Sequence, residues 1–236
     1  MHLLITRPIE DAKPLAQALD KQGHKTSIES LMEIRELKTT NLKLSGIQAI
    51  LITSANGIRA LAKMYKDRNI LICTVGDASA MAAHKLGFTN VRSASGNVEA
   101  LIKIVKKELS PTDGPLVHIA GSYRTGDLAK TLRSAGFVTR RKILYDAKAV
   151  KNFSTKTNIA LKKNNIDGVL FFSPRTASIF CQIVKNSNLL DNCQPIKAFC
   201  LSKAVSTAAA LVPWAKIIVA EKPNSKALLF SIKKNS

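Results

Sequence analysis

Short apolar runs alternate with stretches of helical periodicity along most of the chain. Continuous apolar runs are typical of strands that are buried on both faces of a sheet. They predict strands at 3–7, 47–53, 70–75, 90–92, 116–120, 168–172, 198–201 and 217–220. Between them, apolar residues recur at helical spacing. This spacing predicts helices at 9–22, 56–65, 77–86, 98–109, 126–134, 158–163, 176–185, 204–211 and 225–233. Regular alternation of strand and helix predicts an α/β fold with doubly wound parallel sheets.

The chain contains two internal echoes of a strand–helix unit. Residues 47–61 read IQAILITSANGIRAL and residues 166–180 read IDGVLFFSPRTASIF, each an apolar run that ends in a serine before a helical pattern. LLITRP at 3–8 is likewise echoed by LVHIAG at 116–121. Repeated units of this kind predict two similar α/β lobes. They also place polar loops at the carboxyl ends of strands, where such folds bind ligands.

In two longer segments, 25–37 and 138–150, apolar and polar residues alternate as in a strand, but the segments are too polar for the centre of a sheet. Each follows one of the echoed units, so we expect the two segments to pair as a two-stranded β linker. The chain would then cross twice between the lobes. The predicted boundaries are 1–30 plus 148–236 for one lobe, 39–138 for the other, and 31–38 and 139–147 for the linker strands.

Composition narrows the class of protein. Hydrophobic residues make up 46% of the 236 residues, which is enough for packed cores, and no apolar run is long enough to span a membrane. The first residues, MHLLITRPIE, lack the basic leader and cleavage site of a signal peptide, so we expect a cytoplasmic protein without a membrane partner. The four cysteines form no CxxC pair and the histidines are scattered, so we expect no metal site; Cys73, Cys181 and Cys200 lie in apolar patterns typical of a core.

The formal net charge of +20 has three interpretations. Compositional drift toward lysine would spread positive charge over solvated faces. Nucleic-acid binding would predict clustered basic residues, yet only short runs such as 140–142 and 233–234 occur. A polyanionic small substrate would be attracted by the summed field of the protein. Composition alone does not separate these interpretations.

The chain lacks the nucleotide-binding, serine-hydrolase and zinc-protease motifs of common α/β enzymes. What remains is a set of strand-end loops rich in hydroxyls, at 53–56, 76–79, 95–97, 121–124, 173–176 and 202–203. Each such residue can be read as an ordinary helix N-cap. Helix N-termini also bind carboxylates and phosphates through backbone N–H groups. Several such loops around one cleft would suit a ligand with many anionic groups.

The sequence resembles the uroporphyrinogen-III synthase family. The matching pieces are ITRP at 5–8, LITSANGIRAL at 51–61, VGDASA at 75–80, SGNVEAL at 95–101, HIAGSYRTGDLAKTL at 118–132, ILYDA at 143–147 and FFSPRTASIF at 171–180. Each motif is weak alone, but their order and spacing run through nearly the whole chain. The resemblance implies a two-lobed lyase of heme biosynthesis that uses no cofactor and no metal. Its active site would lie in the cleft between the lobes. Its substrate would be hydroxymethylbilane, a linear tetrapyrrole, which it dehydrates and cyclises with inversion of ring D.

The resemblance also implies roles for individual residues. Tyr145 would be catalytic, by hydrogen-bonding the departing hydroxyl of the substrate; the alternative is an aromatic side chain packed against a lobe. Arg7 and Arg124 would pair with substrate carboxylates, unless they are solvated surface charges. The other residues that would hold acetate and propionate groups are Ser54, Ser79, Ser95, Gly96, Asn97, Gly121, Ser122 and Ser173.

Two departures from the family pattern affect the last cleft loops. Residues 201–205 lack the glycine and paired threonines that the family often carries, and Phe172 replaces a common threonine before Ser173. The main alternative function is a non-catalytic, two-lobed binding protein for an anionic small molecule, which would have no need of a phenol at Tyr145. We expect a monomer that binds no nucleic acid.

Overall fold

The computed structural model describes residues 1–37, 42, 44–123 and 128–236. The chain divides into two compact units, and each contains a largely parallel sheet between helices. Unit 1 combines Met1–Glu33 with Lys148–Ser236, and unit 2 is Ile34–Ala147. The predicted α/β class is confirmed, because both sheets are built largely of parallel strands, and helices separate most strands along the chain.

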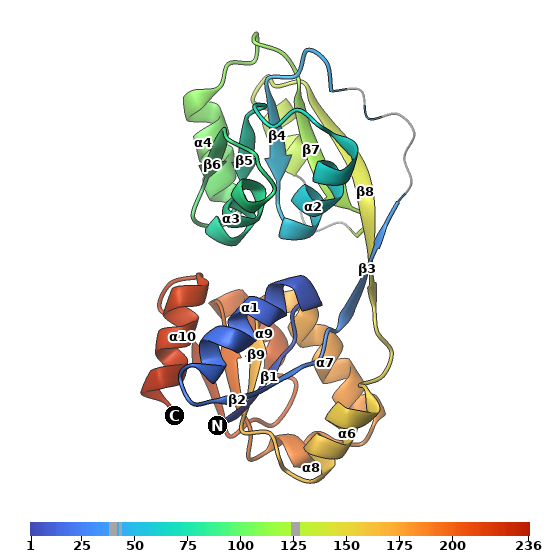
Figure 1. Cartoon of the computed structure of the whole chain (residues 1–236), viewed down its shortest axis with the longest axis vertical. Helices are drawn as coiled ribbons and strands as arrows, with labels where there is room; N and C mark the ends of the chain where they lie inside the picture. The colour runs from blue at the N-terminus through green and yellow to red at the C-terminus, as the bar shows by residue number, and fades with distance from the viewer. Residues whose placement is uncertain (38–41, 43, 124–127) are drawn as a thin grey trace. The chain divides into compact units, whose positions relative to one another are not determined.

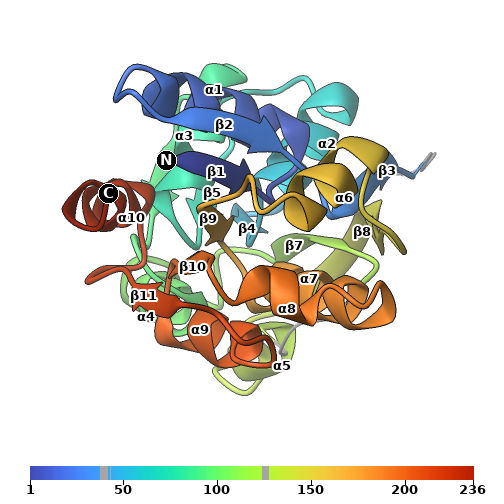
Figure 2. The same ribbon diagram turned by 90° about the horizontal axis from the view of Figure 1, so that it is seen from below.

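The sheet of unit 1 has the strand order β11-β10-β9-β1-β2, and the neighbouring strands run parallel. Figure 2 shows the five strands side by side in this order. They are β1 (His2–Ile5), β2 (Lys25–Ile28), β9 (Gly168–Phe171), β10 (Lys197–Cys200) and β11 (Lys216–Val219). The helices are α1 (Ile9–Asp20), α6 (Thr155–Lys162), α7 (Pro174–Asn186), α8 (Leu190–Cys193), α9 (Lys203–Ala209) and α10 (Ser225–Lys234).

Both faces of the unit 1 sheet are covered, which explains its continuous apolar strands. Successive side chains along a strand point to opposite faces. Leu3 and Ile5 therefore pack against α1 and α10, and Leu4 packs in a second cluster with α6, α7, α8 and α9. These helices are labelled in Figure 1. Val169 and Leu170 divide between the two clusters in the same way.

The sheet of unit 2 has the order β3-β8-β7-β4-β5-β6. Its strands are β3 (Met32–Glu36), β4 (Ala49–Ile52), β5 (Ile72–Thr74), β6 (Val91–Ser93), β7 (Leu116–Gly121) and β8 (Thr139–Ala149). Its helices are α2 (Ala55–Met64), α3 (Asp77–Lys85), α4 (Val98–Glu108) and α5 (Leu128–Arg133). The strands from β8 to β6 run parallel. Helices α4 and α5 pack with Leu51 and Leu116, and α2 lies against Ile119, whose side chain points to the other face.

One strand prediction was wrong. Residues 25–37 do not form a single strand, because β2 belongs to the sheet of unit 1 and β3 to that of unit 2. Alternation of polar and apolar residues cannot distinguish one strand from two consecutive ones in different sheets. Both strands do lie at an edge of their sheet, which fits their polar character. β3 pairs with β8: the Leu37 amide donates to Leu144, and the Val150 amide donates to Leu31.

A buried carboxylate fixes the chain where it leaves unit 1 after β2. The Glu29 residue is only 6% exposed, and its amide donates to the carbonyl of Ile5. Its carboxylate accepts hydrogen bonds from the Ser154 amide (3.0 Å), the Ser154 hydroxyl (2.6 Å) and the Thr157 hydroxyl (2.5 Å). Ser154 is the N-cap of α6, the first helix after the chain re-enters unit 1. Glu29 thus ties the departing segment to the returning one.

We predict that Glu29→Gln lowers the free energy of unfolding by about 1–3 kcal/mol, because the amide turns a donor toward hydrogen-bond donors inside the protein. Urea unfolding followed by circular dichroism measures the change. Glu221→Gln, at an exposed position of the same unit, is the matched control and should shift the unfolding midpoint little. Equal midpoints for the two variants would contradict the role of Glu29.

Candidate functional site

The strand order of unit 1 reverses beside β1. From β1 the chain moves outward to β2 on one side, and later inserts β9 on the other side before continuing to β10 and β11. Ligands of open α/β sheets bind at the carboxyl ends of strands where the order reverses in this way. The loops at this switch point carry Arg7 after β1, and Phe172 and Ser173 after β9. Two of the predicted site residues, Arg7 and Ser173, are therefore brought together.

Unit 2 has the equivalent reversal between β4 and β7. The chain moves outward from β4 to β5 and β6, whereas β7 and β8 lie on the opposite side of β4. Ser54 follows β4, Gly121 ends β7, and Ser122 comes directly after it. Tyr145 lies on β8, paired in register with Gly121. Four predicted residues of the site thus gather at this second switch point.

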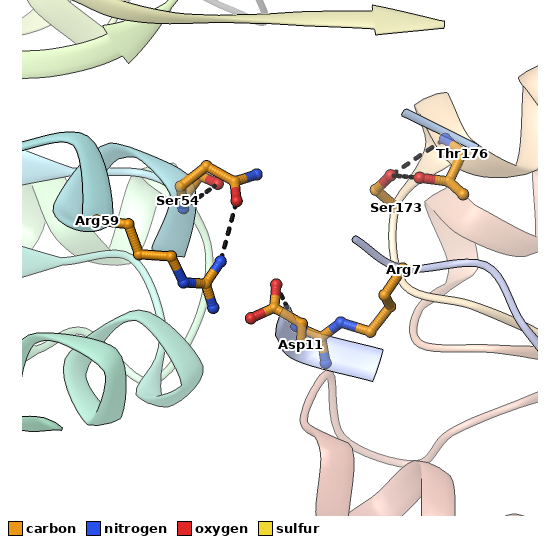
Figure 3. Close-up of polar contacts among 7 residues, drawn as sticks. Arg7, Asp11, Ser54, Arg59, Ser173 and Thr176 are labelled. Atoms are coloured by element: carbon orange, nitrogen blue, oxygen red, sulfur yellow. Dashed lines mark hydrogen bonds and ion pairs between the residues drawn. The ribbon is translucent and has the colours of Figure 1, made fainter. Parts of the chain in front are cut away.

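Three predicted ligand-binding side chains cap helices. The Ser54 hydroxyl accepts from the Asn56 amide (3.2 Å), and the Asn97 side chain accepts from the Ala100 amide (3.0 Å). Figure 3 shows Ser173 beside Thr176; the Ser173 hydroxyl accepts a hydrogen bond from the Thr176 amide at 3.1 Å. The ordinary capping interpretation therefore holds for these side chains. Any contact with a ligand at these positions falls mainly to backbone amides and to the remaining capacity of the hydroxyls.

Arg7 is held by two neighbours within unit 1. Its guanidinium forms an ion pair with Asp11 at 3.5 Å, as Figure 3 shows. The same group lies 4.4 Å from the centroid of the Phe172 ring, within the range of cation–π attraction. Sequence reasoning missed both partners. Asp11 could have been found from its spacing of one helical turn from Arg7, whereas Phe172 becomes a neighbour only through the pairing of β1 with β9.

A third group of predicted residues lies outside the two switch points, at the ends of β5 and β6. The hydroxyls of Ser95 and Ser93 donate to the Asp77 carboxylate at 2.7 and 2.6 Å, and these hydrogen bonds lower the pKa of Asp77. The Gly96 amide donates to Val75, which fixes this loop against the one before α3. Ser79 is buried in that helix. The Ser95 hydroxyl therefore already donates its hydrogen bond to a carboxylate of the protein itself.

The structure does not bring Ser79, Ser95, Gly96 and Asn97 to the β4–β7 switch point, because β5 and β6 lie outward of β4. Arg124, the remaining predicted residue, lies outside the described part of the chain. The predicted site residues therefore fall into two switch-point groups and one outer group.

Tyr145 packs closely within unit 2. The residue is 8% exposed, and the Ser122 amide donates to its backbone carbonyl at 3.0 Å. The Ser122 hydroxyl donates to the carboxylate of Asp146, so this predicted ligand contact is engaged within the protein. The Arg141 guanidinium donates to the carbonyl of Gly121. This network orders the end of β8 beside the irregularity in register at Gly121.

The cysteine thiols do not offer nucleophiles. Burial raises the pKa of Cys73 and Cys181 to about 11, and that of Cys193 and Cys200 to about 12. They are therefore protonated near neutral pH. Within the described residues, no group of three or more His, Cys, Asp or Glu side chains could hold a metal ion. Nor does any described helix combine the length and apolar character needed to cross a bilayer.

The comparisons with known proteins decide the family. A family model described as uroporphyrinogen-III synthase HemD matches residues 13–229, which is most of the chain. The chain belongs to the uroporphyrinogen-III synthase HemD family. No curated protein matches the sequence. As a member of this family the chain is a cyclising lyase of tetrapyrrole biosynthesis, and the function predicted from the motifs is confirmed.

Solved structures show the same fold. Uroporphyrinogen-III synthetase from Helicobacter pylori matches with a TM-score of 0.66 and 16% identity, covering 100% of this chain and 99% of that one. A mutant uroporphyrinogen III synthase from the extremely thermophilic bacterium Thermus thermophilus matches with a TM-score of 0.60 and 14% identity, covering 99% and 98%. Identities this low establish the shared fold, and the family itself rests on the family model. No observation favours the non-catalytic binding protein.

Proposed function

We propose that the two switch-point loop groups hold the carboxylates of hydroxymethylbilane and that Tyr145 assists loss of its hydroxyl. The observation that carries this proposal is that predicted site residues gather where the strand order reverses in both sheets: Arg7 and Ser173 at β1 and β9, Ser54 and Tyr145 at β4, β7 and β8. These are the positions at which α/β sheets bind ligands. A substrate with an acetate and a propionate on every ring offers enough anionic groups for both.

The charges of the protein suit such a substrate at two levels. The net charge of +20 creates a field that attracts a polyanion from a distance. Arg7 supplies a cation at the switch point itself, where its ion pair with Asp11 and its position over Phe172 limit its rotamers. A side chain that is already ordered loses less entropy when it binds a carboxylate. Ser54 and Ser173 add the N-termini of α2 and α7, although Pro174 removes one amide donor from the latter.

The proposed chemistry needs little from the protein beyond position. The hydroxymethyl carbon–oxygen bond breaks, and the hydroxyl takes up a proton from solvent and leaves as water. Closure of the macrocycle later replaces a pyrrole C–H bond with a C–C bond and returns the proton. A hydrogen bond from the Tyr145 phenol to this hydroxyl would favour departure and so formation of the azafulvene cation. That cation otherwise closes on the free end of the tetrapyrrole without inverting ring D. If the protein holds the tetrapyrrole in a conformation that favours the ring-inverting closure, positioning alone accounts for which isomer forms. No strong nucleophile is then required.

The proposal retains the other expectations from the sequence. They are an active site in a cleft between the two lobes, a β linker made by the paired strands, a monomeric state, and no binding of nucleic acid. A cytoplasmic location is supported by the four free thiols, since secreted proteins usually pair their cysteines. The scattered distribution of basic residues along the sequence speaks against a nucleic-acid surface.

We predict that Tyr145→Phe lowers the turnover of enzymically made hydroxymethylbilane by about 10- to 100-fold, because the variant loses one hydrogen bond to the charge that develops on the departing hydroxyl. The wild-type protein should give isomer III. In the variant, spontaneous closure should compete and raise the fraction of isomer I. Product chromatography measures both outcomes.

Tyr65→Phe is the matched control, because Tyr65 lies beyond α2 at the opposite end of that helix from Ser54, where its hydroxyl donates to Asp67. It should retain wild-type turnover. Wild-type rates for Tyr145→Phe would remove the assigned role of Tyr145. Formation of isomer I alone by the wild-type protein would remove the proposed enzymatic function.

We also predict that Arg7→Gln raises KM by about 10-fold or more while kcat changes less, since a charge-assisted contact with the substrate is lost. Lys13→Gln removes one positive charge from the exposed face of α1 and tests the general field alone. Steady-state kinetics at two salt concentrations separate the effects. Equal changes in KM for the two variants would show that Arg7 contributes only to the summed charge.

A further inference from the structure

Gly121 and the Tyr145 ring occupy adjoining space that leaves no room for a side chain between them. A Cβ atom built at Gly121 would lie 2.8 Å from Cε2 and 2.9 Å from Cζ of Tyr145, and 3.3 Å from its hydroxyl oxygen. Real Cβ contacts essentially never fall below 3.0 Å, so any substitution must displace the ring or the strand. The constraint is one of space, because Gly121 does not adopt a positive φ.

The backbone on either side of this contact is firmly held. Gly121 pairs with Tyr145 at the irregular end of the β7–β8 ladder. The Arg141 guanidinium donates to the Gly121 carbonyl, and the Ser122 amide donates to the Tyr145 carbonyl. Strand β7 therefore cannot easily withdraw from β8, and a methyl group at Gly121 would move the ring instead.

A second glycine shows that this tight contact is specific. Gly57, on α2, also faces the Tyr145 ring, but a Cβ there would lie 3.8 Å from Cε1, an ordinary van der Waals distance. The ring thus has normal clearance toward α2 and none toward β7. Of these two glycines, only Gly121 lies so close to the ring that a side chain there would displace the phenol.

We propose that Gly121 is a positioning residue for the reaction: its missing side chain makes the space in which the Tyr145 ring sits, and so determines where the phenol hydroxyl meets the substrate. This inference rests on the proposed role of Tyr145. It replaces the sequence-based expectation that Gly121 contacts substrate carboxylates through its own backbone. The two roles make opposite predictions for a double mutant, because a contact with carboxylates would not depend on the Tyr145 hydroxyl.

The experiment compares four full-length variants: Gly121→Ala, Tyr145→Phe, the double variant, and Gly168→Ala. A Cβ at Gly168 would lie 2.8 Å from Cε2 of Phe199, so this control introduces the same kind of clash at the start of β9, the strand end opposite Ser173. Each variant is assayed for kcat, KM, the ratio of isomers III and I, and thermal midpoint.

We expect Gly121→Ala to lower kcat by about 10- to 100-fold with a much smaller change in KM, the range that a displaced catalytic group can cost. In the Tyr145→Phe background the same substitution should cause no further loss of kcat, although the thermal midpoint should fall in both backgrounds. Gly168→Ala should lower the thermal midpoint and leave kcat of the folded enzyme unchanged.

Two outcomes would overturn the inference while leaving the role of Tyr145 intact. One is wild-type kcat in Gly121→Ala; the other is the same loss of kcat with and without the Tyr145 hydroxyl, which would indicate direct contact with substrate. Wild-type kcat in Tyr145→Phe would instead remove the proposed role of Tyr145 itself.

A second pair of variants applies if Gly121→Ala does not fold. Arg141→Met removes the donor to the Gly121 carbonyl, and Arg140→Met removes the same charge from the neighbouring, exposed position of β8. We expect a several-fold loss of kcat in Arg141→Met that disappears in the Tyr145→Phe background, and no loss in Arg140→Met. Equal kcat for the two arginine variants would overturn the inference.

Discussion

The parallel pairing of strands buried on both faces is the constraint on which the rest of this structure depends. Because most strands are followed by a helix that covers a sheet, the carboxyl ends of these strands and the starts of the helices meet at one edge of each sheet. The strand order then reverses between β1 and β9 in unit 1 and between β4 and β7 in unit 2. Polar residues from distant parts of the chain, such as Arg7 and Ser173, become neighbours without any motif that unites them in sequence.

Several hydroxyl groups at this edge already form hydrogen bonds within the protein, which limits their capacity to bind a ligand. Ser54 and Ser173 cap the helices that begin there, and Ser95 holds Asp77. The site that we propose would therefore bind its ligand chiefly through backbone amides and helix N-termini, with few formal charges. This suits an enzyme whose task is to choose between two closures of a reactive chain, because shape and position matter more than a strong acid or nucleophile.

Much of the fold could be predicted from the sequence, because apolar runs and helical periodicity report burial directly. The runs at β4 and β9, with the serine that ends each, predicted both repeated units and their loops. The segment 25–37 failed because its alternation is the same whether it forms one strand or contributes β2 and β3 to different sheets. The role of the Glu29 carboxylate next to this break depends on Ser154 and Thr157, which lie far along the chain.

The sequence predicted which residues belong to the candidate site, but not which of them contact one another. Family motifs pointed to Tyr145 and Gly121 separately, and only the register of β7 with β8 shows that one makes room for the other. Phe172, a departure from the family pattern, proves to lie against Arg7. In each case the decisive information is a contact between strands that are neighbours in a sheet and remote in sequence, which no local pattern contains.

A structure of the protein with uroporphyrinogen III bound would test the central claim most directly. We expect acetate and propionate groups of the product at the loops that follow β1 and β9 and at those that follow β4 and β7, with the Tyr145 phenol in contact with the macrocycle. Product bound at the opposite, amino-terminal edges of the sheets, or held without contact to either switch point, would contradict the account.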